Sequence, residues 1–378
     1  MTHVPILRKG VPYRSLDTIE VKDFVSGEPL CTVSQANSGL ISRDLRPSPD
    51  EKHPLADIPV RELVERMRKA AELFLDAELP FGDTTQTASD YLELLSRTSG
   101  LPLALCRSNQ QKIHGVLARI EEVLGGLTRG LDLDVLDRGY KDQGGRLVSY
   151  RREARWLGVV LPSNSPGVHS LWAPAIPLKV GLCLKPGRDE PWSPYRMVQA
   201  MVAAGIPREA FSYYPTDHAG ATTILRACER GMVFGDVSTT RLWEKDDRVQ
   251  CHGPGWSKIL IGEDRIDDWP EWIDVIVESI AANGGRSCIN ASGVWVPRHG
   301  REIAQALAER LAKIEARPLD HPEARLAAFV NPQFAEMIHV SIEQALDLPG
   351  AIDLTREVRG SDRLVTVGGA TFLLPTIV

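Results

Sequence analysis

One cysteine lies in a short loop whose sequence suits nucleophilic chemistry. Residues 283–288 have the sequence NGGRSC, and an apolar pattern of helical spacing from Trp272 to Ile280 leads into them. Asn283 and Gly284 interrupt this pattern, as residues that tolerate positive φ do at a helix end, and the apolar run at 293–296 then predicts a strand. A thiol in such a loop can be partly exposed, and N–H groups of the loop can point at a reacting oxygen. Cys288 is therefore a candidate nucleophile; the alternative is a small cysteine buried after a helix end.

Composition limits the classes of function. The six cysteines are scattered, with no Cys-x-x-Cys pair and no histidine spacing typical of zinc, so we expect no disulfide framework, no metal site and a reducing compartment. Residues 1–13 contain no long apolar run, so we expect no signal peptide, no membrane span and a cytoplasmic protein. The net charge of -6 argues against nucleic-acid binding, because phosphate contacts demand a basic surface.

The elements that must position this chemistry alternate between strand and helix patterns. Short apolar runs typical of buried parallel strands occur at residues 156–161, 181–185, 211–214, 232–234 and 257–261. Helical patterns lie between them, including one through Trp172 and Ile176, and three further helical stripes precede them. This alternation predicts an α/β fold with a doubly wound parallel sheet, in which ligands bind at the carboxyl ends of the strands.

Three of the predicted strand ends carry candidate site residues. Asn164 follows the first run, where its amide could donate a hydrogen bond to an oxyanion or could instead cap the next helix. Lys185 ends the second run, which places a cation at the ligand-binding edge. Gly235 lies in a turn that opens a helix and suits an anion. In the alternative interpretation of this turn Ser238 is a plain cap, and Asp236 would repel a phosphate.

Taken together, these segments resemble the aldehyde dehydrogenase superfamily. The loop at 283–288 resembles its nucleophile loop: Asn283, Gly285 and Cys288 match, and Arg286 replaces the usual glutamine. Four further segments follow the order of the family: its Pro-x-Asn-x-Pro turn at 162–166, its Leu-Lys-Pro element at 184–186, its Phe-x-Gly-Ser turn at 234–239, and its Gly-x-Phe-x-x-Pro-Thr element at 370–376 with Ala370 in place of the glycine.

The resemblance implies an aldehyde dehydrogenase-like fold, with a Rossmann-type cofactor domain and an α/β catalytic domain. It implies that Asn164 and the backbone N–H of Cys288 form an oxyanion hole, and that the cofactor is NADP or NAD. Arg188 stands where the family often has an acidic residue, which favours the 2′-phosphate of NADP. The residues that the resemblance assigns to the cofactor are Pro162, Ser163, Lys185, Arg188, Gly235 and Ser238.

One departure from the family changes the predicted reaction. Aldehyde-oxidising members carry, in a Glu-Leu-Gly-Gly-Lys stretch, the glutamate that activates water for hydrolysis of the acyl-enzyme thioester. The corresponding residues here, 251–258, include no glutamate. Coenzyme A would then accept the acyl group, as in the acyl-CoA reductase-like branch, so we expect interconversion of an acyl-CoA and an aldehyde through a thioester on Cys288. His252 could replace the missing base, and His169 is a weaker candidate.

Two other functions stay open at this point. One is a CoA-independent aldehyde dehydrogenase that oxidises an aldehyde to a carboxylate, with His252 or a loop-bound water as base. The other is an inactive nucleotide-binding or assembly subunit. Family members continue past the Phe-x-x-Pro-Thr element with a Glu-x-Phe motif and an oligomerisation strand, whereas this chain ends at Val378, which suggests a fragment and leaves a homo-oligomer as one possible assembly.

Predicted domain boundaries follow from these assignments. We expect an N-terminal segment with helices of the cofactor domain at 1–143, a strand excursion that could serve oligomerisation at 144–155, a Rossmann-type cofactor-binding domain at 156–262, and a catalytic domain, apparently incomplete at its C-terminus, at 263–378.

Overall fold

The computed structural model describes residues 1–46 and 52–378, and the chain divides into two compact units. The first unit comprises Met1–Lys22, Pro29–Leu94 and Ser108–Gly253, and the second comprises Asp23–Glu28, Leu95–Arg107 and Pro254–Val378. The candidate nucleophile Cys288 belongs to the second unit, while Asn164 and the predicted cofactor residues belong to the first.

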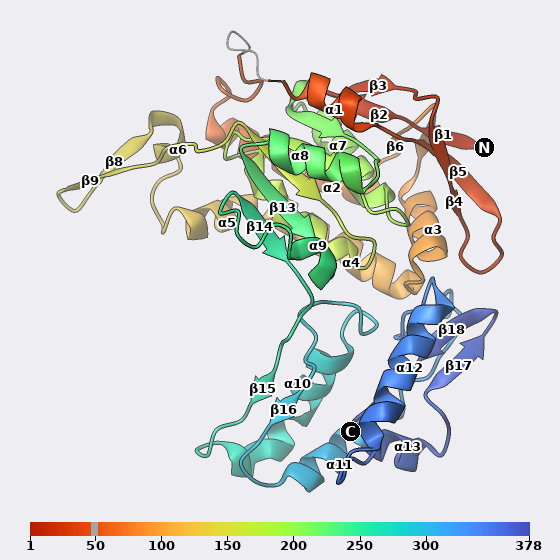
Figure 1. Ribbon diagram of the computed structural model, residues 1–378. Helices are drawn as coiled ribbons and strands as arrows, with labels where there is room; N and C mark the ends of the chain where they lie inside the picture. Colours follow the sequence, from red (N-terminus) through yellow and green to blue (C-terminus); the bar gives the residue numbers. More distant parts are fainter. Residues whose placement is uncertain (47–51) are drawn as a thin grey trace. The chain divides into compact units, whose positions relative to one another are not determined.

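A seven-stranded sheet forms the centre of the first unit (Figure 1). In spatial order its strands are β14 (Val249–His252), β13 (Arg230–Phe234), β10 (Trp156–Val160), β11 (Gly181–Lys185), β12 (Phe211–Tyr213), β2 (Ile6–Arg8) and β3 (Val11–Tyr13). Strands β14 to β12 run parallel, and β2 and β3 extend one edge in antiparallel fashion. Strands β11 and β12 lie on one side of β10, whereas β13 and β14 lie on the other, so the chain order reverses there. This reversal is the arrangement of a doubly wound sheet, and it confirms the predicted fold class.

Both faces of the central strands are buried, as a doubly wound sheet requires. Cys183 on β11 packs with Ile224 of helix α8 (His218–Ala227) on one face. Because successive side chains alternate along a strand, the fully buried Leu182 and Leu184 face the other side. Gly158 on β10 permits this close approach, since a Cβ there would lie 2.9 Å from Cγ2 of Ile224.

Helix α2 (Val60–Asp76) illustrates how a sequence pattern predicts a helix. Its apolar residues recur at helical spacing, and the whole stripe from Val60 to Phe74 is buried. The other helices of the first unit are α1 (Ser38–Asp44), α5 (Ile120–Leu127), α6 (Val135–Arg138), α7 (Trp192–Ala203) and α9 (Val237–Thr240). Its other strands form a three-stranded sheet of β1 (Thr2–Val4), β5 (Pro29–Ser34) and β4 (Thr18–Lys22). Two hairpins complete it, β6 (Leu79–Phe81) with β7 (Thr84–Gln86) and β8 (Tyr140–Gln143) with β9 (Arg146–Ser149). Helices α3 (Ala88–Ser99) and α4 (Leu103–Ala118) contribute residues to both units.

The second unit has a core of its own. Its elements are the parallel pair β15 (Ile259–Leu260) and β16 (Val294–Trp295), the antiparallel pair β17 (Leu364–Val367) and β18 (Ala370–Leu373), and helices α10 (Trp269–Ala281), α11 (Gly300–Leu311), α12 (Pro332–Leu346) and α13 (Leu354–Arg359). Ile273 and Ile276 of α10, Leu307 of α11 and Phe372 of β18 lie within one buried apolar cluster. This packing fixes the end of α10, from which the loop of Cys288 begins.

Two predicted elements differ in the structure. The helix expected through Trp172 and Ile176 is a pair of 3-10 turns, Pro166–Leu171 and Ala173–Ala175, because prolines at 166, 174 and 177 lack the N–H that a longer helix needs. The sequence predicts that the run at 257–261 is a strand of the main sheet, but β15 forms a separate pair with β16, and β14 is the edge strand of the sheet. Strand β14 was missed because Gln250 and His252 interrupt its apolar residues at the sheet edge.

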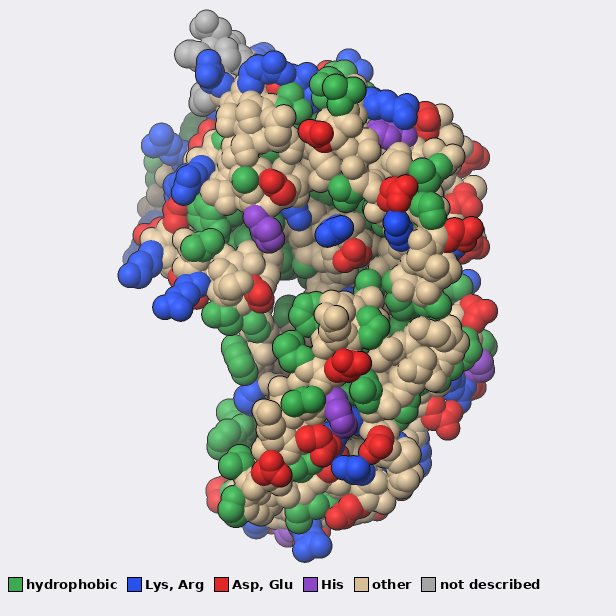
Figure 2. Space-filling view, turned by 45° about the vertical axis from the view of Figure 1, so that its right-hand side comes forward, with side chains coloured by type: hydrophobic (Ala, Val, Ile, Leu, Met, Phe, Trp, Pro, Cys, Tyr) green, Lys and Arg blue, Asp and Glu red, His purple; other side chains and the backbone are tan. Residues whose placement is uncertain are grey.

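Charged side chains of both signs are interspersed over the face of the molecule shown in Figure 2. Within residues 1–46 and 52–378, none of the helices has both the length and the apolar character needed to cross a bilayer.

Candidate active site

The loop of Cys288 joins α10 to β16, and the thiol is exposed. Three successive residues, Asn283, Gly284 and Gly285, have φ values of +53°, +68° and +77°. Glycine adopts this left-handed region without penalty, and asparagine is the side chain that tolerates it best. At Gly284 the absence of a side chain is also required for space, since a Cβ would lie 2.7 Å from the Ala327 nitrogen.

Asn290, which sequence reasoning missed, holds this loop to the end of α10. Its Nδ2 lies 3.3, 3.0 and 3.1 Å from the carbonyl oxygens of Ser279, Ile280 and Ala282, and its Oδ1 accepts a hydrogen bond of 2.7 Å from the Ser287 N–H. The last carbonyls of a helix lack intrahelical partners, so Asn290 supplies donors to them. The available signal was an asparagine two residues after a cysteine that follows a helix end.

Arg286 anchors the same loop on its other side. Its Nη1 donates to the carbonyl of Ser99, at the end of α3 within the second unit. The guanidinium that stands in place of the family's glutamine therefore makes a structural contact with the backbone.

The stretch 251–258, in which the family resemblance would place a catalytic glutamate, contacts the loop of Cys288. A Cβ at Gly255 would lie 1.4 Å from the carbonyl oxygen of Cys288, so the two backbones are in direct contact and only glycine fits there. Residues 251–258 contain no carboxylate. Lys258 is the charged side chain of this stretch, and its Nζ lies 2.6 Å from Oγ of Ser292.

In the first unit, the turns after β10 and β11 contact each other. The Leu161 N–H donates to the carbonyl of Lys185 at 2.8 Å. Oγ of Ser163 accepts a hydrogen bond of 3.1 Å from the Asp189 N–H. A Cβ at Gly187 would lie 2.4 Å from the Pro162 carbonyl oxygen. The structure thus brings the predicted residues Pro162 and Ser163 together with the loop of Lys185, and Asn164 lies in the same turn.

The two cations of this edge differ in exposure. Lys185 is half-buried at the end of β11, and burial lowers its pKa, whereas Arg188 is exposed. Two positive side chains beside a tight, glycine-bearing turn fit the ribose and phosphate groups at the adenosine end of a dinucleotide.

The turn after β13 does not fit a phosphate. Asp236 caps α9, and its Oδ1 accepts hydrogen bonds of 2.7 Å from the Ser238 hydroxyl and 2.8 Å from the Thr239 N–H. These hydrogen bonds lower the pKa of Asp236, which keeps it a carboxylate. The predicted residues Gly235 and Ser238 are therefore together in one turn, but a negative charge occupies the start of the helix, so a pyrophosphate would meet repulsion there.

His252 ends β14 and stacks on Phe234, with ring centroids 4.4 Å apart and an interplanar angle of 13°. Its Nε2 is buried and has no hydrogen-bond partner among the described residues. Burial lowers the pKa of His252, so the imidazole is neutral near pH 7.

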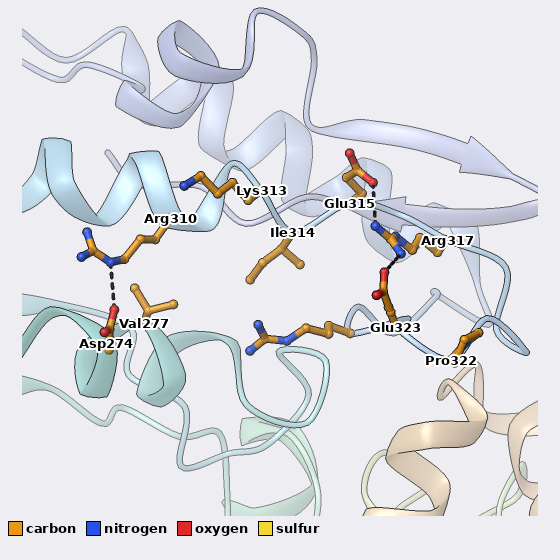
Figure 3. Close-up of a pocket in the computed structure, with 10 residues that line it drawn as sticks. Asp274, Val277, Arg310, Lys313, Ile314, Glu315, Arg317, Pro322 and Glu323 are labelled. Atoms are coloured by element: carbon orange, nitrogen blue, oxygen red, sulfur yellow. Dashed lines mark hydrogen bonds and ion pairs between the residues drawn. The ribbon is translucent and has the colours of Figure 1, made fainter.

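A cavity of about 640 Å³ in the second unit lies apart from all these residues (Figure 3). It is lined by residues of α10, of α11 and of the segment from Lys313 to Arg325. Arg310 pairs with Asp274 at 2.8 Å, and Arg317 pairs with Glu315 and Glu323. None of the predicted site residues lines this cavity.

Comparison with known proteins identifies the family. A sequence model of the aldehyde dehydrogenase family matches residues 11–365. The chain therefore belongs to the aldehyde dehydrogenase family of oxidoreductases, as its motifs suggested, with the Rossmann-type fold of that family. A comparison with curated proteins finds no match.

Solved structures agree with this fold over almost the whole chain. Succinate-semialdehyde dehydrogenase from Burkholderia pseudomallei is 18% identical with a TM-score of 0.76, and the match covers 99% of this chain and 75% of that one. An NAD+ complex of aldehyde dehydrogenase from Bacillus cereus is 18% identical with a TM-score of 0.77, covering 99% and 74%. An NAD-dependent aldehyde dehydrogenase from Sinorhizobium meliloti is 20% identical with a TM-score of 0.74, covering 99% and 73%.

Proposed function

We propose that this protein interconverts an acyl-CoA and an aldehyde with NADP or NAD as cofactor, through a thioester on Cys288. Membership of the aldehyde dehydrogenase family supports the reaction class. The finer proposal rests on one observation: the stretch against the Cys288 backbone, residues 251–258, holds no carboxylate to activate water. A thioester that is not hydrolysed can pass its acyl group to the thiol of coenzyme A.

In the direction of reduction, the Cys288 thiolate attacks the carbonyl carbon of the acyl-CoA. The tetrahedral intermediate collapses, the C–S bond to coenzyme A breaks, and the coenzyme leaves as its thiolate. A reduced nicotinamide cofactor, when bound, would supply the hydride that reduces the enzyme thioester. The resulting thiohemiacetal on Cys288 loses its C–S bond, which releases the aldehyde and restores the thiolate.

Asn164 and the two cations Lys185 and Arg188 have separate roles in this proposal. The Asn164 amide donates a hydrogen bond to the oxyanion of each tetrahedral species, a contribution of about 3 kcal/mol for one such donor. Lys185 and Arg188 hold the adenosine end of the cofactor, and Arg188 favours NADP because its guanidinium can bind the 2′-phosphate. Asp236 gives no support to a pyrophosphate at the β13 turn.

The experiment is to oxidise an aldehyde with and without coenzyme A and to identify the product. We expect reduction of the nicotinamide to depend on coenzyme A and to yield the acyl-CoA, with no turnover by Cys288→Ser. Formation of a carboxylate without coenzyme A would instead identify a CoA-independent dehydrogenase. In that case His252→Phe, which keeps the stacking on Phe234, shows whether His252 is the base. Cofactor binding without any turnover would indicate an inactive subunit.

A further inference from the structure

A chain of fully buried polar side chains connects the two turns that hold the predicted cofactor residues and Asn164. His169 Nε2 lies 2.6 Å from Oε2 of Glu190, and neither side chain is more than 1% exposed. The chain continues through Ser193 to Tyr91, whose hydroxyl lies 2.7 Å from the Ser193 hydroxyl, and both of these residues are fully buried. The proposed reaction uses none of these groups.

The partners of the imidazole determine where its proton lies. The Trp172 indole N–H donates to Nδ1 of His169 at 3.5 Å, so Nδ1 is the acceptor and Nε2 carries the hydrogen. Nε2–H then donates to Oε2 of Glu190, and Oε1 of Glu190 accepts a hydrogen bond of 2.8 Å from the Ser193 N–H. Each carboxylate oxygen thus has a donor, which a buried carboxylate requires.

The hydrogen bond between His169 and Glu190 joins two segments that follow neighbouring strands of the sheet. His169 lies in the 3-10 turn Pro166–Leu171, which begins two residues after Asn164. Glu190 ends the loop that begins at Lys185, and its Oε1 accepts a hydrogen bond from the Ser193 N–H in the first turn of α7. The hydrogen bond between them therefore joins the segment after β10 to the segment after β11, 21 residues later in sequence.

We infer that His169 and Glu190 are positioning residues, whose hydrogen bond fixes Asn164 relative to the cofactor loop of Lys185 and Arg188. This inference rests on the proposed function for the roles of Asn164 and Lys185, while the link itself is independent of them. The hydrogen bond between the Asp189 N–H and Oγ of Ser163 also connects the turn after β10 to the turn after β11. The buried pair holds the 3-10 segment Pro166–Leu171 that follows this turn, and the Ser165 side chain makes no capping hydrogen bond at the start of that segment.

Substitutions of His169 and of Glu190 by glutamine distinguish the effect of the hydrogen bonds from the effect of side-chain size. In His169→Gln the amide can donate to Glu190 through its nitrogen and accept from Trp172 through its oxygen, so both hydrogen bonds can be kept. In Glu190→Gln an amide N–H₂ replaces one carboxylate oxygen. If its N–H₂ faces His169, the imidazole must move its proton to Nδ1, which then opposes the Trp172 N–H. If its oxygen faces His169, the Ser193 N–H loses its acceptor.

The experiment measures amide hydrogen exchange of residues 162–171 and 186–192, dinucleotide affinity, and the rate at which an acyl-CoA acylates Cys288. We expect His169→Ala and Glu190→Gln to speed exchange in both segments. We also expect acylation to slow and dinucleotide binding to weaken by about 10- to 100-fold each, as for a buried polar group left unsatisfied. His169→Gln should retain most of the acylation rate and most of the dinucleotide affinity of the wild type.

Met67→Ala is the matched control, because Met67 is fully buried on α2 of the same unit and belongs to no part of the polar chain. It should lower thermal stability without selective exchange in the two segments. If the exchange, affinity and acylation of His169→Ala match those of Met67→Ala, the inference is wrong. If the wild-type protein neither binds a dinucleotide nor is acylated, the proposed function fails, and the exchange data alone then judge whether the pair links the two turns.

Discussion

Asn290 links the loop of Cys288 to the helix before it through one side chain. Its amide nitrogen donates to the carbonyls at the end of α10, and its oxygen accepts from the Ser287 N–H, one residue before Cys288. The position of the thiol in the loop therefore depends on both halves of the amide.

We predict that Asn290→Asp, which keeps the shape and the acceptor but removes the donors, lowers the reactivity of Cys288. The acceptors are partly buried, and loss of a donor to such groups costs about 1–3 kcal/mol, so the rate of turnover should fall about 10- to 100-fold while the KM for the aldehyde changes little. Alkylation of Cys288, followed by peptide mass mapping, measures the thiol directly. Gln305→Ala on α11, where the side chain donates a hydrogen bond to Glu309 of the same helix, should leave that rate unchanged. Equal alkylation rates in wild type and Asn290→Asp would refute this role.

At the scale of elements, Arg196 joins α7 to the end of α2. It is 1% exposed, and its guanidinium donates to the carbonyls of Phe74 at 3.0 Å, Gln86 at 3.1 Å and Ala77 at 2.7 Å. Burial lowers the pKa of Arg196, and the carbonyl oxygens compensate for the lost hydration of the charge. This side chain completes the C-terminus of α2 from a neighbouring helix.

Arg196→Leu should therefore lower the free energy of unfolding by about 3 kcal/mol or more, because it leaves buried carbonyls without donors. Arg68→Leu on the exposed side of α2, where the arginine pairs with Glu65 and Glu121, should cost about 0–1 kcal/mol. Chemical denaturation of both variants measures the difference. A similar loss for the two would show that the carbonyls at the end of α2 do not need Arg196.

The sequence predicts elements whose signal is local and misses contacts that depend on tertiary pairing. The stripe of α2 and the apolar runs of β10 and β11 are visible without the structure. Strand β14 is not, because its apolar residues alternate with Gln250 and His252. In the site, the left-handed loop before Cys288 follows from its asparagine and glycines. The pairing of His169 with Glu190 does not, since it exists only when β10 and β11 lie side by side in register.

At the scale of the whole molecule, the proposed reaction uses residues of both compact units. Asn164 belongs to the first unit and Cys288 to the second. The family match covers residues 11–365 and so includes both. In the proposed function, Cys288 becomes acylated and Asn164 stabilises the oxyanion formed in that step.

The most direct test is to mix the purified protein with an acyl-CoA, without reduced cofactor, and to follow its intact mass over time. We expect a gain equal to the acyl group in the wild type and no gain in Cys288→Ala. We also expect acylation about 10²- to 10³-fold slower in Asn164→Ala, because an oxyanion donor is lost. A folded wild-type protein that gains no mass, or a gain that persists in Cys288→Ala, would contradict the proposed function.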